Sequence, residues 1–229
     1  MIKTNEKIIL ITGASRGIGK AIAESINGIK IVTSRDSNSV KNIGDFQYAL
    51  DLNSLENTKM FVEQIFRDFP RVDVLINNAG ILGEIGTLEE SSFDSWNEVM
   101  DCNLNNQFFL TKELLPLIKK SKKGSIINVS SSVGRTPRKQ WGAYAVSKAG
   151  LEAMTTILSE ELSEYSIIVN SVNPGGTATE MRKQAVPNED QSKLPQPKDI
   201  VSIFNYLSSD KAIETGKQFN ARDYLKKEF

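Results

Sequence analysis

The feature that most constrains the fold is a glycine-rich turn, TGASRGIG (12–19), which directly follows the apolar stretch KIILIT (7–12). A continuous apolar run rich in β-branched residues is typical of a strand buried on both faces of a sheet. Apolar residues with helical spacing follow the turn, and Asn27-Gly28 is predicted to end that helix. The chain is therefore predicted to begin with a strand, a tight turn and a helix.

The three glycines of this turn, Gly13, Gly17 and Gly19, predict a phosphate site. Without a Cβ, the backbone turns tightly and lets a pyrophosphate approach the helix N-terminus, where free N–H groups and the helix dipole favour anions. The spacing G-x3-G-x-G differs from the dinucleotide fingerprint G-x-G-x-x-G, and a tight turn without a ligand is the alternative. Because the turn follows the first predicted strand, nucleotide binding is favoured.

Short apolar runs and helical patterns alternate along the rest of the chain. This alternation predicts an α/β fold, in which a parallel sheet carries helices on both faces. The segment 35–45 is short and polar, so little or no helix is expected there. The further predicted strands are 29–34, 46–50, 72–76, 125–130, 167–172 and 217–221, and the predicted helices are 54–68, 92–119, 143–164 and 198–208.

Composition narrows the class of protein. The 229 residues suit one domain spanning 1–229. Lys plus Arg and Asp plus Glu are 28 each, which gives no electrostatic sign of a nucleic-acid or membrane partner. With no histidine and a single cysteine, Cys102, the chain has almost no ligands for a zinc site, and no metal is expected. No apolar run is long enough for a membrane span or a signal peptide, so a soluble cytoplasmic protein is expected.

Two arginines indicate which nucleotide the turn binds. In such folds a group about 20 residues beyond the turn meets the adenosine ribose, where an acid suits NAD and an arginine suits the 2′-phosphate of NADP. Arg35 follows the end of the second predicted strand, and Arg16 within the turn adds a second positive charge. NADP(H) is therefore favoured. NAD(H) is the alternative if Asp36 meets the ribose, and a solvated Arg35–Asp36 pair would contact neither.

The stretch YAVSK (144–148) supplies candidates for acid–base chemistry in a chain without histidine. Tyr144 and Lys148 are four residues apart, so on a helix they share one face. A hydride delivered to a carbonyl leaves an alkoxide that needs a proton, which a tyrosine with a pKa of about 10 can give. A nearby ammonium and an oxidised, positive nicotinamide are expected to lower that pKa, so that the tyrosine works in both directions. The alternative is an amphipathic helix with a surface lysine.

Four motifs occur in one order: TGASRGIG (12–19), NNAG (77–80), strand-end serines followed by YAVSK (144–148), and NPGGTATEM (173–181). Over residues 7 to about 208 the chain resembles the short-chain dehydrogenase/reductase family, in its compact single-domain branch. The resemblance implies a three-layer, doubly wound Rossmann-type sheet of about seven parallel strands in the order 3-2-1-4-5-6-7. It also implies an enzyme that uses NAD or NADP to interconvert a carbonyl and an alcohol.

The same resemblance implies a catalytic set. Tyr144 would be the general acid/base, and Lys148 would also hold the nicotinamide ribose. A hydroxyl should polarise the carbonyl, and the fifth predicted strand ends in three candidates, Ser130, Ser131 and Ser132. The resemblance selects Ser131, which lies 13 residues before the tyrosine.

An asparagine completes that set. The resemblance implies that Asn103 holds a water leading to Lys148, while Asn105 and Asn106 are alternatives in the same stretch. The residues implied to contact the cofactor, besides Tyr144 and Lys148, are Gly13, Ser15, Arg16, Gly17, Ile18, Gly19, Arg35, Asp51, Leu52, Asn77, Asn78, Ala79, Gly80, Pro174, Gly175, Thr177 and Thr179.

Two segments depart from the family pattern. The connection after the second strand is shorter than usual, and the chain ends in KQFNARDYLKKEF instead of a Val-Asp-Gly-Gly-like turn. The C-terminal departure is not expected to touch the catalytic motif. A homo-oligomer, either a dimer or a tetramer, is expected, with the helices 92–119 and 143–164 as the subunit contacts implied by the resemblance.

The function favoured is an NADPH-dependent carbonyl reductase acting on a small molecule. A 3-oxoacyl-thioester reductase and a non-catalytic NADP-binding regulator are the alternatives, and a sugar-nucleotide epimerase would need a longer chain. The polar segment 176–197 is predicted to be a lid or a disordered surface loop. A further hypothesis is that basic residues rim the substrate mouth and favour an anionic carbonyl, and the alternative is a solvated basic loop. The rim residues are Arg135, Arg138, Lys139, Arg182 and Lys183, with Trp141 among them.

Overall fold

The computed structural model describes residues 5–225. Seven strands form one parallel sheet in the order β3-β2-β1-β4-β5-β6-β7, which confirms the predicted fold class and strand order. The strands are β1 (Ile8–Ile11), β2 (Ile29–Ser34), β3 (Phe46–Ala49), β4 (Val74–Asn77), β5 (Gly124–Val129), β6 (Ile167–Asn173) and β7 (Gln218–Asn220). Each lies within about a residue or two of its predicted bounds.

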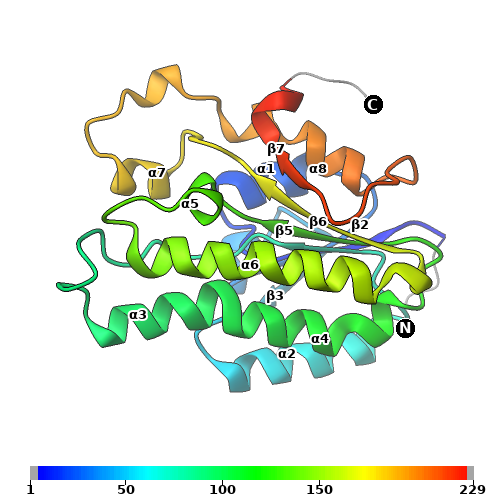
Figure 1. The fold of residues 1–229 in the computed structure, drawn as a ribbon. Helices are drawn as coiled ribbons and strands as arrows, with labels where there is room; N and C mark the ends of the chain where they lie inside the picture. Colours follow the sequence, from blue (N-terminus) through cyan, green and yellow to red (C-terminus); the bar gives the residue numbers. More distant parts are fainter. Residues whose placement is uncertain (1–4, 226–229) are drawn as a thin grey trace.

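Helices cover both faces of the sheet (Figure 1). Side chains alternate along each strand, so Ile8 and Leu10 of β1 join the core on one face while Ile9 and Ile11 join the core on the other. The first core is completed by α2 (Leu55–Asp68), α4 (Asn106–Ile118) and α6 (Gly142–Glu161), and the second by α1 (Gly17–Ser25) and α8 (Ser202–Leu207). This double burial explains the continuous apolar run at the start of the chain.

The strand order reverses at β1, which pairs with both β2 and β4. Leu10 lies opposite Ile31 on one side and Leu75 on the other. Connections that leave neighbouring parallel strands toward opposite faces open a crevice at the carboxyl ends of those strands. The fold therefore places a crevice directly beyond the glycine turn.

Two helices differ from prediction. The predicted helix 92–119 is split into α3 (Phe93–Met100), a π-helical segment η2 (Asp101–Asn105) and α4. The prediction that Asn27-Gly28 caps the first helix is wrong, because α1 ends at Ser25 and the extended Ile26 is its C-cap. Gly28 instead has a φ of +134° in the turn into β2, and a Cβ there would meet the Lys7 carbonyl oxygen at 2.7 Å.

The connections are short and mostly helical turns. As predicted, the segment after β2 holds little helix, a single 3₁₀ turn η1 (Ser37–Val40). The segment predicted to be a lid or a disordered loop contains α7 (Glu180–Ala185) and η4 (Gln191–Lys193). The remaining turns are α5 (Ser132–Arg135), η3 (Ser163–Tyr165), η5 (Pro197–Ile200) and η6 (Ala221–Tyr224). Within residues 5–225, no helix has the length and apolar character needed to cross a bilayer.

Candidate active site

A cleft of about 920 Å³ lies beyond the carboxyl ends of the central strands. Its walls come from the residues that follow β1, β2, β4, β5 and β6, together with α6 and the segment around α7. All the residues predicted for catalysis or cofactor binding line this cleft except Asn77 and Asn103. Four motifs that are far apart in the sequence are thus brought to one cavity of a size typical of ligand sites.

The glycine turn packs too closely for any side chain at its third glycine. A Cβ on Gly19 would lie 2.3 Å from the Gly13 carbonyl oxygen and 2.4 Å from Asn78 Nδ2. Asn78 Nδ2 in turn donates to the carbonyl oxygens of Thr12 and Gly13 at 2.9 and 3.0 Å. The N-cap residue Arg16 makes no side-chain capping bond to α1, so the first N–H groups of that helix are left for another acceptor. The turn therefore fits the pyrophosphate of a dinucleotide.

The two arginines lie at the same end of the cleft. Arg16 and Arg35 are both exposed and both line the cavity. Asp36 does not line it, because its Oδ1 accepts from the backbone N and the Nδ2 of Asn38, at 2.9 and 3.1 Å, and so caps η1. The Asp36 carboxylate, which would favour NAD, is thus hydrogen-bonded at the start of η1. The Arg16 and Arg35 side chains remain available to bind an anion.

At the other end of the cleft, Ser131, Tyr144 and Lys148 come together. Tyr144 is half-buried and hydrogen-bonded to Ser131, whose own hydroxyl caps the short helix α5. Lys148 is 3% exposed, and its Nζ donates to the Val129 carbonyl oxygen at 2.7 Å. Burial lowers the pKa of the Lys148 ammonium to about 8, against the opposing effects of Cys102 and Glu152. A lysine with such a pKa can exchange its proton near physiological pH.

The protein's own groups raise the pKa of Tyr144, so the expected lowering would have to come from the oxidised nicotinamide. Burial disfavours the phenolate, and the hydrogen bond with Ser131 opposes this effect without overcoming it. The Lys148 Nζ lies 5.8 Å from the centre of the tyrosine ring. At neutral pH the phenol therefore keeps its proton and is suited to give it away.

A family model described as short chain dehydrogenase matches residues 7–190. The chain belongs to the short chain dehydrogenase family. Among curated relatives, oxidoreductase YciK of Escherichia coli is 38% identical over 234 residues, which cover 95% of this chain and 92% of the relative. The 3-oxoacyl-(acyl-carrier-protein) reductase FabG of Salmonella typhimurium is 34% identical over 223 residues, which cover 90% of this chain and 91% of the relative.

Solved structures agree with this assignment. A short chain dehydrogenase from Shigella flexneri complexed with NADP has a TM-score of 0.90 and 38% identity, covering 94% of this chain and 97% of that one. One from Escherichia coli complexed with NADPH has a TM-score of 0.89 and 38% identity, covering 94% and 96%. The predicted family is confirmed, and the chain is an oxidoreductase of that family.

In this short chain dehydrogenase, Asn103 supports the site from outside the cleft. It is fully buried in the π-helical segment η2, where its Oδ1 accepts from Ile81 N and its Nδ2 donates to Ile81 O, both at 2.8 Å. Gly80 fits between Asn103 and Lys148, since a Cβ there would lie 3.1 Å from Asn103 Oδ1 and 3.6 Å from Lys148 Nζ. Asn103 does not line the cleft itself, because its side chain is bonded to the backbone after NNAG, and its predicted role of holding a water that leads to Lys148 stays a prediction.

Two further expectations are corrected. Asn77 does not face the cleft, because its Nδ2 donates to Thr111 and Asn128 inside the protein, at 2.9 and 2.8 Å. The basic rim is only partly present, since Trp141, Arg182 and Lys183 line the cleft but Arg135, Arg138 and Lys139 do not. Arg182 is also paired with Glu189, with N–O distances of 2.5 and 2.7 Å, which reduces the free positive charge at the mouth.

The C-terminal segment contacts the loop after β6, outside the catalytic motif. A guanidinium N–H of Arg222 in η6 donates to the Gly176 carbonyl oxygen. On the other side of the same loop, the Arg182 side chain lies 3.4 Å from the position of a Cβ on Gly176. The loop after β6 is therefore held between the C-terminal segment and α7.

Sequence reasoning named neither Leu82 nor Cys102 as a cleft residue, and it set Ser130 aside in favour of Ser131. Leu82 and Cys102 are buried beneath the cavity, and Ser130 Oγ has no hydrogen-bond partner within residues 5–225. Burial raises the pKa of the Cys102 thiol to about 11, so the group stays protonated and unreactive. The sequence signal that could have found Cys102 is its place next to Asn103. The signal for Ser130 is its place among the three strand-end serines.

Proposed function

We propose that this short chain dehydrogenase is an NADPH-dependent carbonyl reductase. The observation that carries the proposal is the grouping of Ser131, Tyr144 and the buried Lys148 at one wall of a cleft. A regulator that only binds NADP would not need a phenol with a raised pKa bonded to a serine hydroxyl at that place. The NADP and NADPH bound in the two solved relatives support the choice of cofactor.

The cofactor would be held along the whole cleft. The glycine turn and the N-terminus of α1 would bind the pyrophosphate, and Arg16 and Arg35 would bind the 2′-phosphate. Asp51 and Leu52 would contact the adenine, with Asn78, Ala79 and Gly80 near the ribose and pyrophosphate, and Lys148 would hold the nicotinamide ribose. The loop from Pro174 to Thr179 would face the nicotinamide. Bound NADPH would supply the hydride that reduces the carbonyl carbon.

The chain's own residues would supply the proton and hold the carbonyl. The Ser131 hydroxyl would bond the carbonyl oxygen, where negative charge develops. The Tyr144 Oη would give its proton to that oxygen, so that one hydride and one proton yield the alcohol. Because its pKa is raised, Tyr144 is protonated at neutral pH, which favours reduction over oxidation. Lys148, with a pKa of about 8, would then help to return a proton to the Tyr144 Oη.

The test is a titration with NADPH and NADH, followed by a panel of aldehydes and ketones with loss of NADPH absorbance as the readout. We expect tight binding of NADPH, weaker binding of NADH, and turnover with at least one carbonyl class. Binding without turnover across a broad panel would overturn the reductase and favour a regulator. Tighter binding of NADH than of NADPH would overturn the choice of cofactor.

A 3-oxoacyl-thioester reductase is the second candidate. The specific observation in its favour is the 34% identity to FabG over nine-tenths of both chains. Including 3-oxoacyl thioesters of short and medium chain length in the panel separates the two candidates. A kcat/KM for a thioester about a hundredfold above that of simple ketones would identify it as the substrate class.

The state of assembly and the location of the protein stay predictions. Support for a homo-oligomer comes from apolar side chains left exposed on α4 and α6, namely Phe108 at 51%, Val146 at 44% and Ile157 at 55%. Analytical ultracentrifugation tests the dimer or tetramer, and a monomer at micromolar concentration would refute it. The cytoplasmic location is tested by fractionation.

A further inference from the structure

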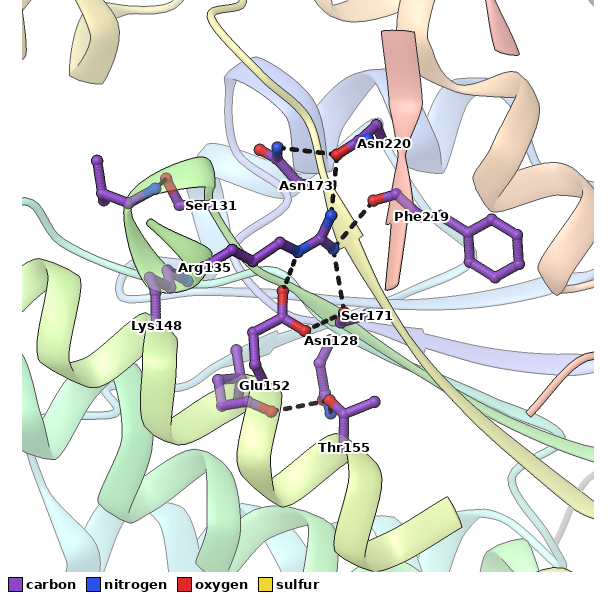
Figure 2. A network of polar contacts seen from close by, with 12 residues as sticks. Asn128, Ser131, Arg135, Lys148, Glu152, Thr155, Ser171, Asn173, Phe219 and Asn220 are labelled. Atoms are coloured by element: carbon purple, nitrogen blue, oxygen red, sulfur yellow. Dashed lines mark hydrogen bonds and ion pairs between the residues drawn. The ribbon is translucent and has the colours of Figure 1, made fainter. Parts of the chain in front are cut away.

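A buried ion pair links the serine-bearing turn to the catalytic helix. Arg135, the last residue of α5, donates from Nε to Glu152 Oε1 of α6 at 2.8 Å. The two side chains are only 18% and 7% exposed. The second carboxylate oxygen of Glu152 accepts from Ser171 Oγ of β6 at 2.5 Å (Figure 2). Both carboxylate oxygens of Glu152 are therefore hydrogen-bonded, one to α5 and the other to β6.

The rest of the guanidinium reaches the edge strand β7. Its Nη1 donates to Asn220 Oδ1 at 2.8 Å, and its Nη2 donates to the Phe219 carbonyl oxygen at 3.1 Å and to Ser171 Oγ at 3.3 Å. Figure 2 shows Arg135 at the centre of these contacts, with α6 on one side and β7 on the other. A planar fork with five N–H groups can serve three directions at once, which a lysine ammonium on a flexible stem does not reproduce.

The network continues into the loop after β6. Asn220 Oδ1 also accepts from Asn173 Nδ2 at 3.2 Å, and Asn173 Oδ1 accepts from Gly175 N at 2.9 Å. A chain of hydrogen bonds therefore runs from Glu152 through Arg135 and Asn220 to the backbone of the loop that faces the proposed nicotinamide position. The C-terminal segment, which departs from the family pattern, provides the middle of this chain.

The spacing of these residues places the proposed catalytic groups one turn away. Ser131 lies four residues before Arg135, and Lys148 lies four residues before Glu152 on the same face of α6. The two elements are in direct contact here, since a Cβ on Gly134 would lie 2.7 Å from the Lys148 carbonyl carbon. A shift of α5 against α6 would therefore move Ser131 relative to Tyr144 and Lys148.

We propose that Arg135 is a positioning residue, acting through Glu152 and Asn220 to hold the Ser131 turn, the Lys148 helix and the 174–177 loop in one arrangement. This inference rests on the proposed function, because the groups held are those assigned to the reduction. Misplacement of about 1 Å at reacting groups can cost as much as a hundredfold in rate, so the network is expected to affect kcat more than binding.

The test compares Arg135→Lys and Asn220→Ala with Arg71→Lys. Arg71 is a matched control because its Nε also donates to a buried carboxylate, Asp73, at 2.9 Å, but at the amino-terminal end of the sheet. We expect Arg135→Lys to lower kcat about tenfold or more while the Kd for NADPH changes less than threefold. Arg71→Lys lowers the melting temperature and leaves kcat near that of the wild type.

A second readout is amide hydrogen exchange at Gly175, Gly176 and Thr177 in the protein without cofactor. Arg135→Lys and Asn220→Ala should both speed exchange there, and Arg71→Lys should not. If Arg135→Lys does not fold, Asn220→Ala decides, since it removes one branch of the network and leaves the ion pair. Wild-type kcat together with wild-type exchange in either variant overturns the proposal. A wild-type protein without turnover would refute the proposed function. The exchange measurement would still show whether Arg135 and Asn220 hold the 174–177 loop.

Discussion

The two ends of the cleft differ in how their charged groups are held. Lys148, at the proposed nicotinamide end, is buried, bonded to a backbone carbonyl and lowered in pKa. Arg16 and Arg35, at the glycine turn, are exposed. Buried, bonded groups are fixed before a substrate arrives, whereas exposed cations supply attraction that solvent partly screens. We therefore expect changes at the nicotinamide end to lower kcat, and changes at the glycine-turn end to weaken binding.

Apart from the loss of the Tyr144 hydroxyl, the largest effect is expected at Ser131. Replacing it with alanine removes the hydroxyl proposed to bond the carbonyl oxygen, so kcat should fall about a hundredfold with the Kd for NADPH nearly unchanged. The matched control is Ser132→Ala, because Ser132 is the exposed neighbour in the same turn. Steady-state kinetics on both variants check this. Equal losses in the two would show that the turn, and not the Ser131 hydroxyl, matters.

The next effect is expected at Gly19. A Cβ there overlaps the Gly13 carbonyl oxygen and Asn78 Nδ2, so Gly19→Ala must shift the turn and should weaken NADPH binding about tenfold or more. Gly86→Ala is the control, because its Cβ would meet only Glu90 Oε2, at 3.8 Å. Calorimetric titration with NADPH measures both. Wild-type affinity for NADPH in Gly19→Ala would show that the glycine turn is not part of the binding site.

A smaller effect is expected at Arg35. Substitution by serine should weaken NADPH binding roughly tenfold, because one charge-assisted contact to the 2′-phosphate is lost, and should leave NADH binding unchanged. The loss should shrink at high ionic strength, since the group is exposed. Lys41→Ser, which removes a nearby exposed cation outside the cleft, is the control. An equal loss for NADH and NADPH would refute the role of Arg35 in cofactor choice.

The smallest effect is a pH dependence of binding. The Lys148 ammonium is the form that would hold the nicotinamide ribose, and its pKa is lowered to about 8 by burial. Below that pH the group is charged, and above it the charge is lost, so NADPH affinity should fall a few-fold as pH rises through about 8. Fluorescence titration across this range measures it, with Lys148→Met expected to bind weakly at every pH. A wild-type affinity that is constant with pH would contradict the assignment.

Much of the fold was open to sequence reasoning because local patterns determine it. The continuous apolar strand, the glycine turn and the alternation of strands with helices depend on nearby residues, and the structure confirms them. The π-helical segment Asp101–Asn105 was missed, since its composition resembles that of an ordinary helix interior. Its consequence, that Asn103 bonds Ile81 instead of facing the cleft, depends on that local geometry.

The parts of the site that were missed depend on contacts between distant segments. Arg135 appeared to be a loop cation, but its partner Glu152 lies 17 residues away and Asn220 lies 85 residues away. The effect of burial, which raises the pKa of Tyr144, could not be predicted because only the packed structure determines it, while the lowering expected from an oxidised nicotinamide stays a prediction. Burial and long-range pairing thus distinguish the two ends of the cleft more than residue type does.

The most direct measurement of the central claim is single-turnover NADPH oxidation by Tyr144→Phe, saturated with cofactor and with a carbonyl that the wild type reduces. The phenol hydroxyl is the proposed proton donor, so the rate should fall by about a factor of a thousand while NADPH still binds. Tyr48→Phe, which removes a hydroxyl bonded to Asp68 at the surface, should keep the wild-type rate. A near-normal rate in Tyr144→Phe would contradict the account.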